Sequence, residues 1–153
     1  GGNFFGGVCI NLLRHPAWGR AQETYGEDPY LLGLMGSALV RGVQRHNVMA
    51  CIKHYARNSI ENSRFKVDVD LDERTLREVY LPHFRRCIEA GAAAVMGAYN
   101  RTLDEPCCAS KLLIEDILRD EWDFQGHFVS DCMALSDFHL NHKITKDAAV
   151  IND

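Results

Sequence analysis

The chain has 153 residues, of which 46% are hydrophobic and 25% are charged, as in an average globular domain. Its formal net charge of −4 offers no basic face for nucleic acid, and no apolar run approaches the roughly 20 residues that a membrane-spanning helix needs. The composition therefore predicts neither a nucleic-acid partner nor a membrane partner.

Six cysteines are present, and no two of them form a C-x-x-C pair. This spacing argues against a structural zinc site or a dithiol redox motif. Cys9, Cys51 and Cys87 lie in apolar segments, where a thiol is a small core residue. We expect no metal and no cofactor, and the cysteine usage favours a reducing compartment such as the cytoplasm.

Four short apolar runs predict buried strands. Runs that are apolar at nearly every position suit parallel strands covered on both faces. They are Val8–Leu13, Val48–Ile52, Ala93–Ala98 and His127–Ser130.

Three helices are predicted between these strands. The first begins at the N-cap pair Asp28-Pro29 and runs to about Arg45. Glycine weakens a helix, so we expect close packing against the sheet at three positions of this one. They are Gly33, Gly36 and Gly42.

The second helix begins near Asp70, where Glu73 resembles a capping box, and ends at Gly91. Pro82 should bend or interrupt it. The third helix covers residues 110–122. The alternation of strands and helices predicts an α/β fold with parallel strands, either a small open sheet or half of a (β/α)₈ barrel, because a whole barrel takes about 250 residues.

Polar side chains follow the carboxyl ends of all four predicted strands. They are Arg14 and Arg20, then Lys53 and His54, then Tyr99 and Asn100, then Asp131. Taken alone, an Asp after a strand is most often a helix cap, and a Lys-His pair is usually a surface feature. Together they predict a ligand-binding edge, because parallel α/β sheets bind ligands at the carboxyl ends of their strands.

Four segments carry a specific set of motifs in a fixed order. Residues 11–30 resemble N-x-x-R-x-P-x-W-G-R followed by E-x-x-G-E-D-P-Y, and residues 51–64 resemble K-H-F-A followed by E-x-x-R. Residues 95–100 resemble V-M-x-x-Y-N, and residues 118–131 resemble L-R-x-E-W-G-F-x-G-x-V-x-S-D. In this order they are similar to the catalytic barrel of glycoside hydrolase family 3, in its bacterial β-glucosidase-like branch.

The resemblance implies a role for each of seven residues. Asp131 aligns with the carboxylate that attacks the anomeric carbon and forms a glycosyl-enzyme intermediate in a retaining reaction. Tyr99 aligns with a tyrosine beside that carboxylate, and Met96 with a pocket-lining position. The residues that align with those holding the sugar hydroxyls are Arg20, Lys53, His54 and Arg64. Arg14 and Trp18 match positions that we interpret as structural.

The resemblance also implies that residues 1–153 are part of a single TIM-barrel-like catalytic domain, with four strands and three helices of that barrel. The family's early barrel strands and its second domain, which usually supplies a glutamate as the general acid/base, would then lie outside the chain. The expected partners are this second domain and a small-molecule or oligosaccharide β-glycoside. We expect the chain alone to hydrolyse glycosides poorly or not at all.

Two features point to different substrates. Residues 61–65 and 72–82 resemble bacterial β-glucosidases, which favours a β-glucoside. Cys132 stands directly after the implied nucleophile, where many members have tryptophan, and this is similar to the β-xylosidase branch. A β-xyloside is therefore the alternative within the family.

Three further readings remain. A non-catalytic sugar-binding fragment would keep the donor cluster without turnover. A nucleotide-dependent enzyme is disfavoured because no G-x-G-x-x-G or G-x-x-x-x-G-K-[ST] motif occurs. A metal site at His139 and His142 is disfavoured because their spacing is not that of a helical i, i+4 pair and because we expect this tail to be exposed. The pattern assigns no fold to residues 136–153.

Overall fold

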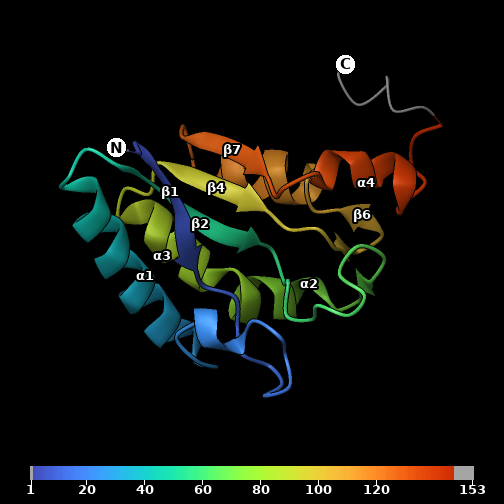
Figure 1. The fold of residues 1–153 in the computed structure, drawn as a ribbon, viewed down its shortest axis with the longest axis horizontal. Helices are drawn as coiled ribbons and strands as arrows, with labels where there is room; N and C mark the ends of the chain where they lie inside the picture. The colour runs from blue at the N-terminus through green and yellow to red at the C-terminus, as the bar shows by residue number, and fades with distance from the viewer. Residues whose placement is uncertain (1, 147–153) are drawn as a thin grey trace.

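The computed structural model describes residues 2–146, which form a four-stranded parallel sheet with helices packed on it. The strands are β1 (Phe4–Cys9), β2 (Met49–Tyr55), β4 (Ala94–Gly97) and β7 (His127–Ser130). They lie side by side in chain order, and every neighbouring pair is parallel (Figure 1). The predicted parallel α/β fold is confirmed. The sequential order is that of consecutive barrel strands, because a doubly wound sheet reverses its order at a switch point.

Two strands differ from their predicted bounds by more than one residue. β1 runs from Phe4 to Cys9. Its register with β2 shifts at the Gly6-Gly7 pair, and the strand includes residues on both sides of this shift, so it begins before the predicted Val8. β2 runs on to Tyr55, so that Lys53 and His54 lie inside the strand and not after it. The apolar runs correctly predicted which segments are buried, but they predicted the ends of the hydrogen-bonded strands less well.

The first predicted helix is α1 (Pro29–Gln44), and the Asp28 side chain accepts a hydrogen bond from the Tyr30 N–H at 2.8 Å as its N-cap. A Cβ atom at Gly33 would lie 2.7 Å from Arg86 Cδ, and one at Gly36 would lie 2.6 Å from Cys87 Sγ. The close packing predicted for these two glycines therefore exists, although its main partner is α3 and not the sheet. At Gly42 the prediction is wrong, because nothing lies within 4 Å of that position.

The second predicted helix is divided into α2 (Glu73–Thr75), the π-helical η2 (Leu76–Tyr80) and α3 (Pro82–Glu89). Pro82 begins α3, which agrees with the predicted interruption, because proline has no N–H for the preceding helical ladder. The N-cap is Asp72 rather than Asp70, since its carboxylate accepts from the Thr75 N–H at 2.7 Å.

The remaining elements are the third predicted helix and several short segments. The third predicted helix is π-helical, η3 (Leu112–Glu121), and a short 3₁₀ turn, η1 (Ala21–Glu23), follows β1. The sequence did not predict α4 (Ala134–Leu140) or the small sheet of β3 (Asp68–Val69), β5 (Arg101–Thr102) and β6 (Glu105–Pro106). Strands of two residues leave no periodic signal. Within residues 2–146 no helix is both long and apolar enough to cross a membrane.

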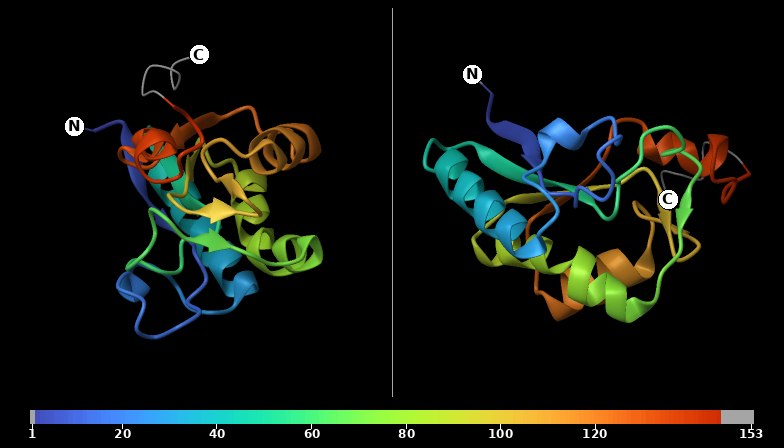
Figure 2. Two further views of the ribbon diagram at one scale, coloured as in Figure 1. Left: turned by 90° about the vertical axis from the view of Figure 1, so that its right-hand side faces the viewer. Right: turned by 90° about the horizontal axis from the view of Figure 1, so that it is seen from below.

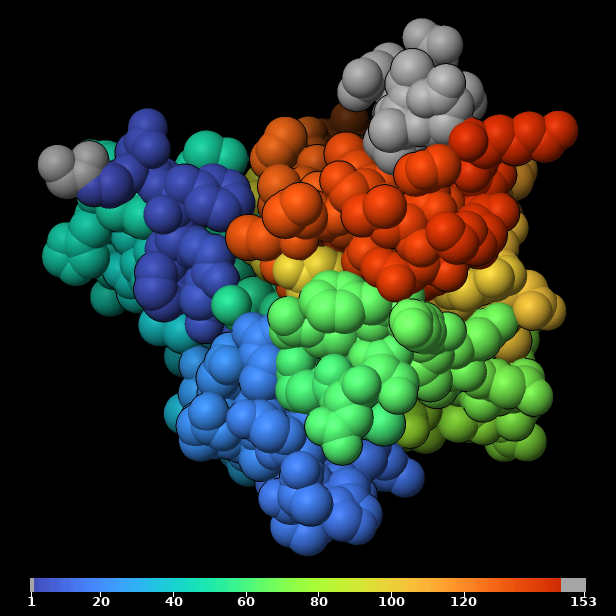
Figure 3. Space-filling model, turned by 45° about the vertical axis from the view of Figure 1, so that its right-hand side comes forward, coloured from blue at the N-terminus to red at the C-terminus, as the bar shows by residue number. Residues whose placement is uncertain are grey.

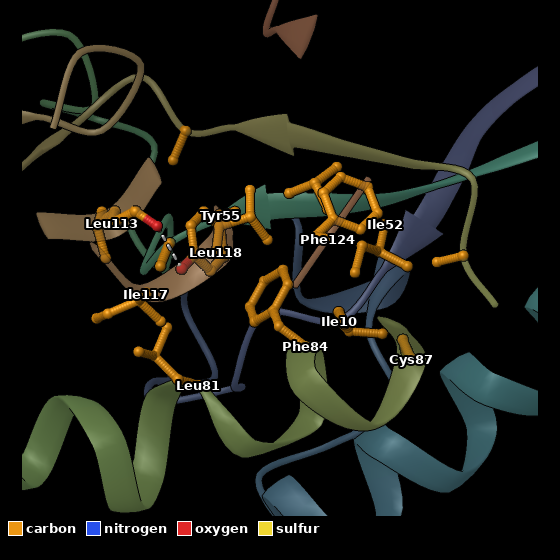
Figure 4. Close-up of a cluster of buried hydrophobic side chains, with 14 of the residues drawn as sticks. Ile10, Ile52, Tyr55, Leu81, Phe84, Cys87, Leu113, Ile117, Leu118 and Phe124 are labelled. Atoms are coloured by element: carbon orange, nitrogen blue, oxygen red, sulfur yellow. Dashed lines mark hydrogen bonds between the residues drawn. The ribbon is translucent and has the colours of Figure 1, made fainter. Parts of the chain in front are cut away.

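The hydrophobic core lies between the sheet and the helices α1, α3 and η3 (Figures 1 and 2). Tyr55 is fully buried in it, and its hydroxyl donates to the Leu113 carbonyl at 2.9 Å (Figure 4). The sheet and helix side chains that meet around this tyrosine are Ile10, Ile52, Phe84, Ile117 and Leu118. This apolar layer fixes the strands beneath the site.

The opposite face of the sheet carries a different set of side chains. The register pairs Phe4 with Met49 and pairs Lys53 with Met96, so each pair points to the same side. Phe4 and Met49 are each 41% exposed at the amino end of this face. Towards the carboxyl end the face becomes polar at Lys53 and leads into the candidate site.

Candidate active site at the carboxyl edge of the sheet

Asp131 follows β7 directly and is only 8% exposed. Its backbone N–H donates to the Gly97 carbonyl at 3.3 Å, which continues the β4–β7 ladder by one residue. Carboxylate Oδ1 accepts from the Cys132 N–H at 2.7 Å, whereas Oδ2 is buried without a hydrogen-bond partner in the part of the chain that the structure describes. The carboxylate is thus held by the backbone and left with unused acceptor capacity.

His54 is an ionisable neighbour of that carboxylate. Its ring Nε2 lies 3.4 Å from Asp131 Oδ2, and the side chain is 1% exposed. Burial, followed by the positive charges of Arg20, Lys53 and Arg64 in that order, lowers the pKa of His54 to about 2. The imidazole is therefore neutral at physiological pH.

Arg20 and Lys53 meet at a shared carboxylate. Arg20 forms two hydrogen bonds to Glu23, at 2.7 and 2.8 Å, and Lys53 Nζ lies 4.0 Å from the same carboxylate. The hydrogen bond to Arg20 is the main cause that lowers the pKa of Glu23. Cys9 lies close to this group, and burial raises the pKa of its thiol. Two cations and one anion leave a net positive charge beside His54.

Arg64 has a similar arrangement on the loop after β2. Its Nη1 donates to Glu61 at 2.8 Å, and the other oxygen of Glu61 accepts from the Trp18 indole at 3.0 Å. The guanidinium lies 4.6 Å above the ring of Tyr99. Trp18 is 5% exposed, so its ring packs inside the protein and offers no open platform.

Tyr99 lies between Arg64 and the segment that carries Asp131. Its hydroxyl donates to the Cys132 carbonyl at 2.7 Å, and burial, followed by the charge of Asp131, raises the pKa of Tyr99 to about 12. It also lines a pocket of about 380 Å³ with Phe65 and Cys132. Met96 stands beside Lys53 on the strand register. A neutral phenol thus borders the carboxylate.

The loops that carry these residues come from distant parts of the chain. In the space-filling view the blue loop after β1, the green loop after β2 and the red segment around α4 lie next to one another (Figure 3). The Trp18–Glu61 contact joins the first two loops, and the Phe65–Tyr99 contact joins the loop after β2 to the residues that follow β4. The edge is therefore one continuous surface.

Residues 9–151 match the family model described as the N-terminal domain of glycosyl hydrolase family 3. The chain belongs to glycoside hydrolase family 3. The family resemblance carried by the motifs is therefore confirmed, and with it the assignment of the fold to part of the family's TIM-type barrel.

Two relatives illustrate the membership. The chain is 46% identical to a xylan 1,4-β-xylosidase of Xylanibacter ruminicola over 91% of its own length and 17% of that protein. It is 43% identical to a β-glucosidase of Bacteroides ovatus over 86% of its own length and 18% of that protein. The chain therefore spans less than a fifth of the length of either relative.

Solved structures of the family agree. A β-glucosidase 3B of Thermotoga neapolitana in complex with glucose has a TM-score of 0.84 at 37% identity, over 88% of this chain and 20% of that one. An exo-β-xylosidase in complex with a xylobiose aziridine probe has a TM-score of 0.92 at 33% identity, over 99% of this chain and 22% of that one.

Within this family fold, the structure brings the seven implied site residues to one edge, while their roles stay predictions. Arg14 lies apart from them, with its guanidinium 5.9 Å from the centre of the Tyr80 ring. Sequence reasoning missed three partners of the site, namely Asn11, Glu23 and Glu61. Glu23 and Glu61 each stand three residues from an arginine, and this spacing was the available signal.

His142 corrects one expectation about the tail. Its side chain is 7% exposed, and ring Nε2 lies 2.8 Å from the Tyr99 carbonyl. The segment was expected to be exposed, but α4 turns it back onto the strand end. Within residues 2–146, no three His, Cys, Asp or Glu side chains gather in a metal-binding group. Residues 147–153 of the tail lie outside the described part.

Proposed function

We propose that this chain supplies the nucleophile and the sugar-holding pocket of a retaining β-glycosidase that acts on terminal non-reducing β-glycosidic bonds, foremost β-glucosidic ones. The observation that carries the proposal is the position of Asp131, a buried carboxylate with unused acceptor capacity at the carboxyl edge of the sheet. Membership of glycoside hydrolase family 3 supports it.

The chemistry proposed for this carboxylate has two steps. In the first, an Asp131 oxygen forms a bond to the anomeric carbon while the bond from that carbon to the leaving oxygen breaks, and an acid protonates the leaving oxygen. In the second, water attacks the same carbon, loses its proton to that same group acting as a base, and releases Asp131. Two inversions give net retention of configuration.

The surrounding residues fit these steps. Lys53 and Arg20 carry N–H donors around Glu23 at the same edge of the sheet as Asp131, and such donors suit the lone pairs of sugar hydroxyls. Positive charge nearby favours the ionised form of a carboxylate, which is the form that attacks. Tyr99, with its pKa raised to about 12 by burial and by the charge of Asp131, remains a neutral hydroxyl.

Trapping of the intermediate tests the nucleophile. The natural protein that carries this chain would be incubated with a 2-deoxy-2-fluoro-β-glucoside bearing a good leaving group, and its peptides analysed by mass spectrometry. A fluoroglucosyl adduct is expected on Asp131. The matched control is Asp137→Asn, because Asp137 is also buried, at 6% exposure, and among residues 2–146 its carboxylate accepts a side-chain hydrogen bond from Asn141 alone. An adduct on another residue, or full activity in Asp131→Asn, would overturn the assignment.

The acid/base is proposed to come from outside residues 1–153. A retaining enzyme needs a carboxylic acid about 5–5.5 Å from the nucleophile, and the family resemblance places that group in a second domain. Hydrolysis of an aryl β-glucoside by the purified 153-residue chain should be at least about a hundredfold slower than by the natural protein. Equal rates would show that the acid lies within this chain.

A β-xyloside is the second candidate substrate. It is favoured by the 46% identity to a xylan 1,4-β-xylosidase and by exposed Cys132 beside the nucleophile, where a thiol leaves a different pocket floor from a tryptophan. The ratio of kcat/KM for matched aryl β-glucoside and β-xyloside substrates separates the two. A purely sugar-binding role predicts no turnover of either, with binding that survives Asp131→Asn.

A further inference from the structure

Asn11 is bound to His54 through three hydrogen bonds across 43 residues of sequence. Asn11 Nδ2 donates to the His54 carbonyl at 2.8 Å, and the His54 backbone N–H donates to Asn11 Oδ1 at 2.9 Å. Ring Nδ1 of His54 also lies 2.9 Å from Asn11 Oδ1. Both side chains are 1% exposed. The two backbone groups accept only one orientation of the amide, so the atom facing the ring is an oxygen.

This orientation determines where the histidine proton is. An amide oxygen has no hydrogen to give, so Nδ1 must carry the proton for the contact to be a hydrogen bond. A neutral imidazole carries one proton only, and His54 is neutral in its buried, cationic surroundings. Nε2 is consequently a bare acceptor.

The bare nitrogen points at another acceptor. Nε2 lies 3.4 Å from Asp131 Oδ2, and that oxygen has no hydrogen-bond partner among the described residues. Two lone pairs cannot bond each other. With its proton on Nε2 instead, His54 would donate to the carboxylate, stabilise its charge and make it a weaker nucleophile.

We propose that Asn11 is a positioning residue that holds the His54 proton on Nδ1 and thereby keeps the Asp131 carboxylate one hydrogen bond short. The consequence for catalysis rests on the proposed role of Asp131 as nucleophile, whereas the position of the proton does not. Removal of Asn11 frees the ring to take the other tautomer, and the Nε2–H group then donates to Asp131.

The ionisable side chains around His54 and Asp131 are the same in every variant of the test. The ionisable side chains that influence His54, Asp131 or both are Arg20, Lys53, Arg64, Cys51, Tyr99 and Cys108. None of them is altered by a change at position 11, so a difference between variants reports the tautomer.

The first measurement is of the tautomer itself. Nitrogen-15 spectra of the histidine-labelled natural protein that carries this chain, with the His54 signals assigned by their loss in His54→Phe, distinguish a protonated from a bare ring nitrogen. Nδ1 is expected to be protonated and Nε2 bare. A proton on Nε2 in the unmodified protein overturns the proposal without any variant.

Three variants extend this measurement. Asn11→Ala should move the proton to Nε2, and an unchanged spectrum in the folded variant overturns the proposal. Asn11→Asp offers only acceptors, so Nδ1 must stay protonated. Ser59→Ala is the matched control. Ser59 donates to the Leu12 carbonyl at 3.1 Å, and this bond joins the loop after β1 to the loop after β2 without involving His54. Its spectrum should be unchanged.

The second measurement is the pH dependence of kcat/KM on an aryl β-glucoside. In Asn11→Ala the acid limb should shift to lower pH by roughly half to one unit, with the plateau lowered about tenfold, because a bonded carboxylate ionises more easily and attacks less well. A uniform loss at all pH values, shared by Ser59→Ala, would indicate a merely structural role and overturn the proposal. If the nitrogen spectra agree and no glycoside is hydrolysed, the proposed function fails and the positioning role stands.

Discussion

The carboxyl edge of the sheet and its helix-covered face each bury a histidine at 1% exposure, in different surroundings. His83 lies in α3 with its ring centre 4.9 Å from that of Phe84, and burial alone lowers its pKa to about 3. His54 has Asn11, Asp131 and three cations around it, and its pKa falls to about 2. Burial is the main cause in both. A neutral, buried histidine is therefore no sign of a site by itself, and its polar neighbours are what distinguish the edge from the core.

The largest expected effect tests that distinction by making the same substitution on both sides. His54→Phe should lower kcat/KM of the natural protein on an aryl β-glucoside by about a hundredfold or more, because a side chain implied to hold a sugar hydroxyl is replaced by a hydrocarbon ring. His83→Phe should leave kcat/KM within about threefold, since its ring lies in α3 against Phe84 and not at the carboxyl edge. Steady-state kinetics of both variants provide the check. Equal losses of kcat/KM in the two variants would contradict the distinction between the edge and the core.

The second effect is on stability at low pH, where the two histidines should act alike. Each has a folded pKa below its unfolded value near 6.5. Above pH 6.5 both states are neutral and nothing is lost. As the pH falls from 6.5 towards the folded pKa, the unfolded chain takes up protons that the folded chain excludes, so stability is lost. By pH 4.5 each histidine should lower the free energy of unfolding by about 2 to 3 kcal/mol.

Urea unfolding of the chain and of His83→Phe at pH 7.0 and 4.5 checks this. Between pH 7.0 and pH 4.5 the free energy of unfolding should fall by about 2 to 3 kcal/mol less in the variant than in the unmodified chain, because phenylalanine has no proton to bind. If the difference in unfolding free energy between the two proteins does not depend on pH, His83 is protonated in the folded state. This experiment concerns the core alone and leaves the tautomer of His54 untouched.

The same contrast explains what the sequence could predict. Asp28-Pro29 predicted the start of α1, and the apolar runs predicted four parallel strands, because caps and burial are local properties of the chain. Ile10 was placed in the first strand because it lies in an apolar run; it is fully buried, yet it lies beyond the end of β1. Burial is visible in a sequence, whereas the end of a hydrogen-bonded ladder depends on the neighbouring strand.

The site was predictable in part for a related reason. Asp131 and Lys53 stand near strand ends, and the fold alone brings strand ends together. Asn11 was not singled out, because its partner lies 43 residues away and the contact depends on how the loop after β1 packs against β2. Glu23 and Glu61 reach arginines only three residues away, so their pairing could have been proposed from spacing.

A smaller effect tests how tightly the core side is packed. Gly36→Ala places a methyl group 2.6 Å from Cys87 Sγ and 2.9 Å from Ile10 Cγ2. The overpacking should destabilise the chain by about 1 to 3 kcal/mol, measured by urea unfolding at pH 7.0. The kcat/KM of the folded natural protein should not change, because α1 contributes no side chain to the edge. A more stable variant would mean that α1 and α3 move apart at little cost.

The smallest effect has the opposite sign and comes from the same helix. Gly42 lies on the exposed side of α1 with nothing within 4 Å, so Gly42→Ala gains helix propensity without a clash. Urea unfolding should show a stabilisation of up to about 1 kcal/mol. Loss of stability in this variant would show that the exposed side of α1 has a contact outside the described residues. The two glycines are identical in the sequence and belong to one helix, so the sign of each substitution is set by α3 packing against one side of α1 and solvent lying on the other.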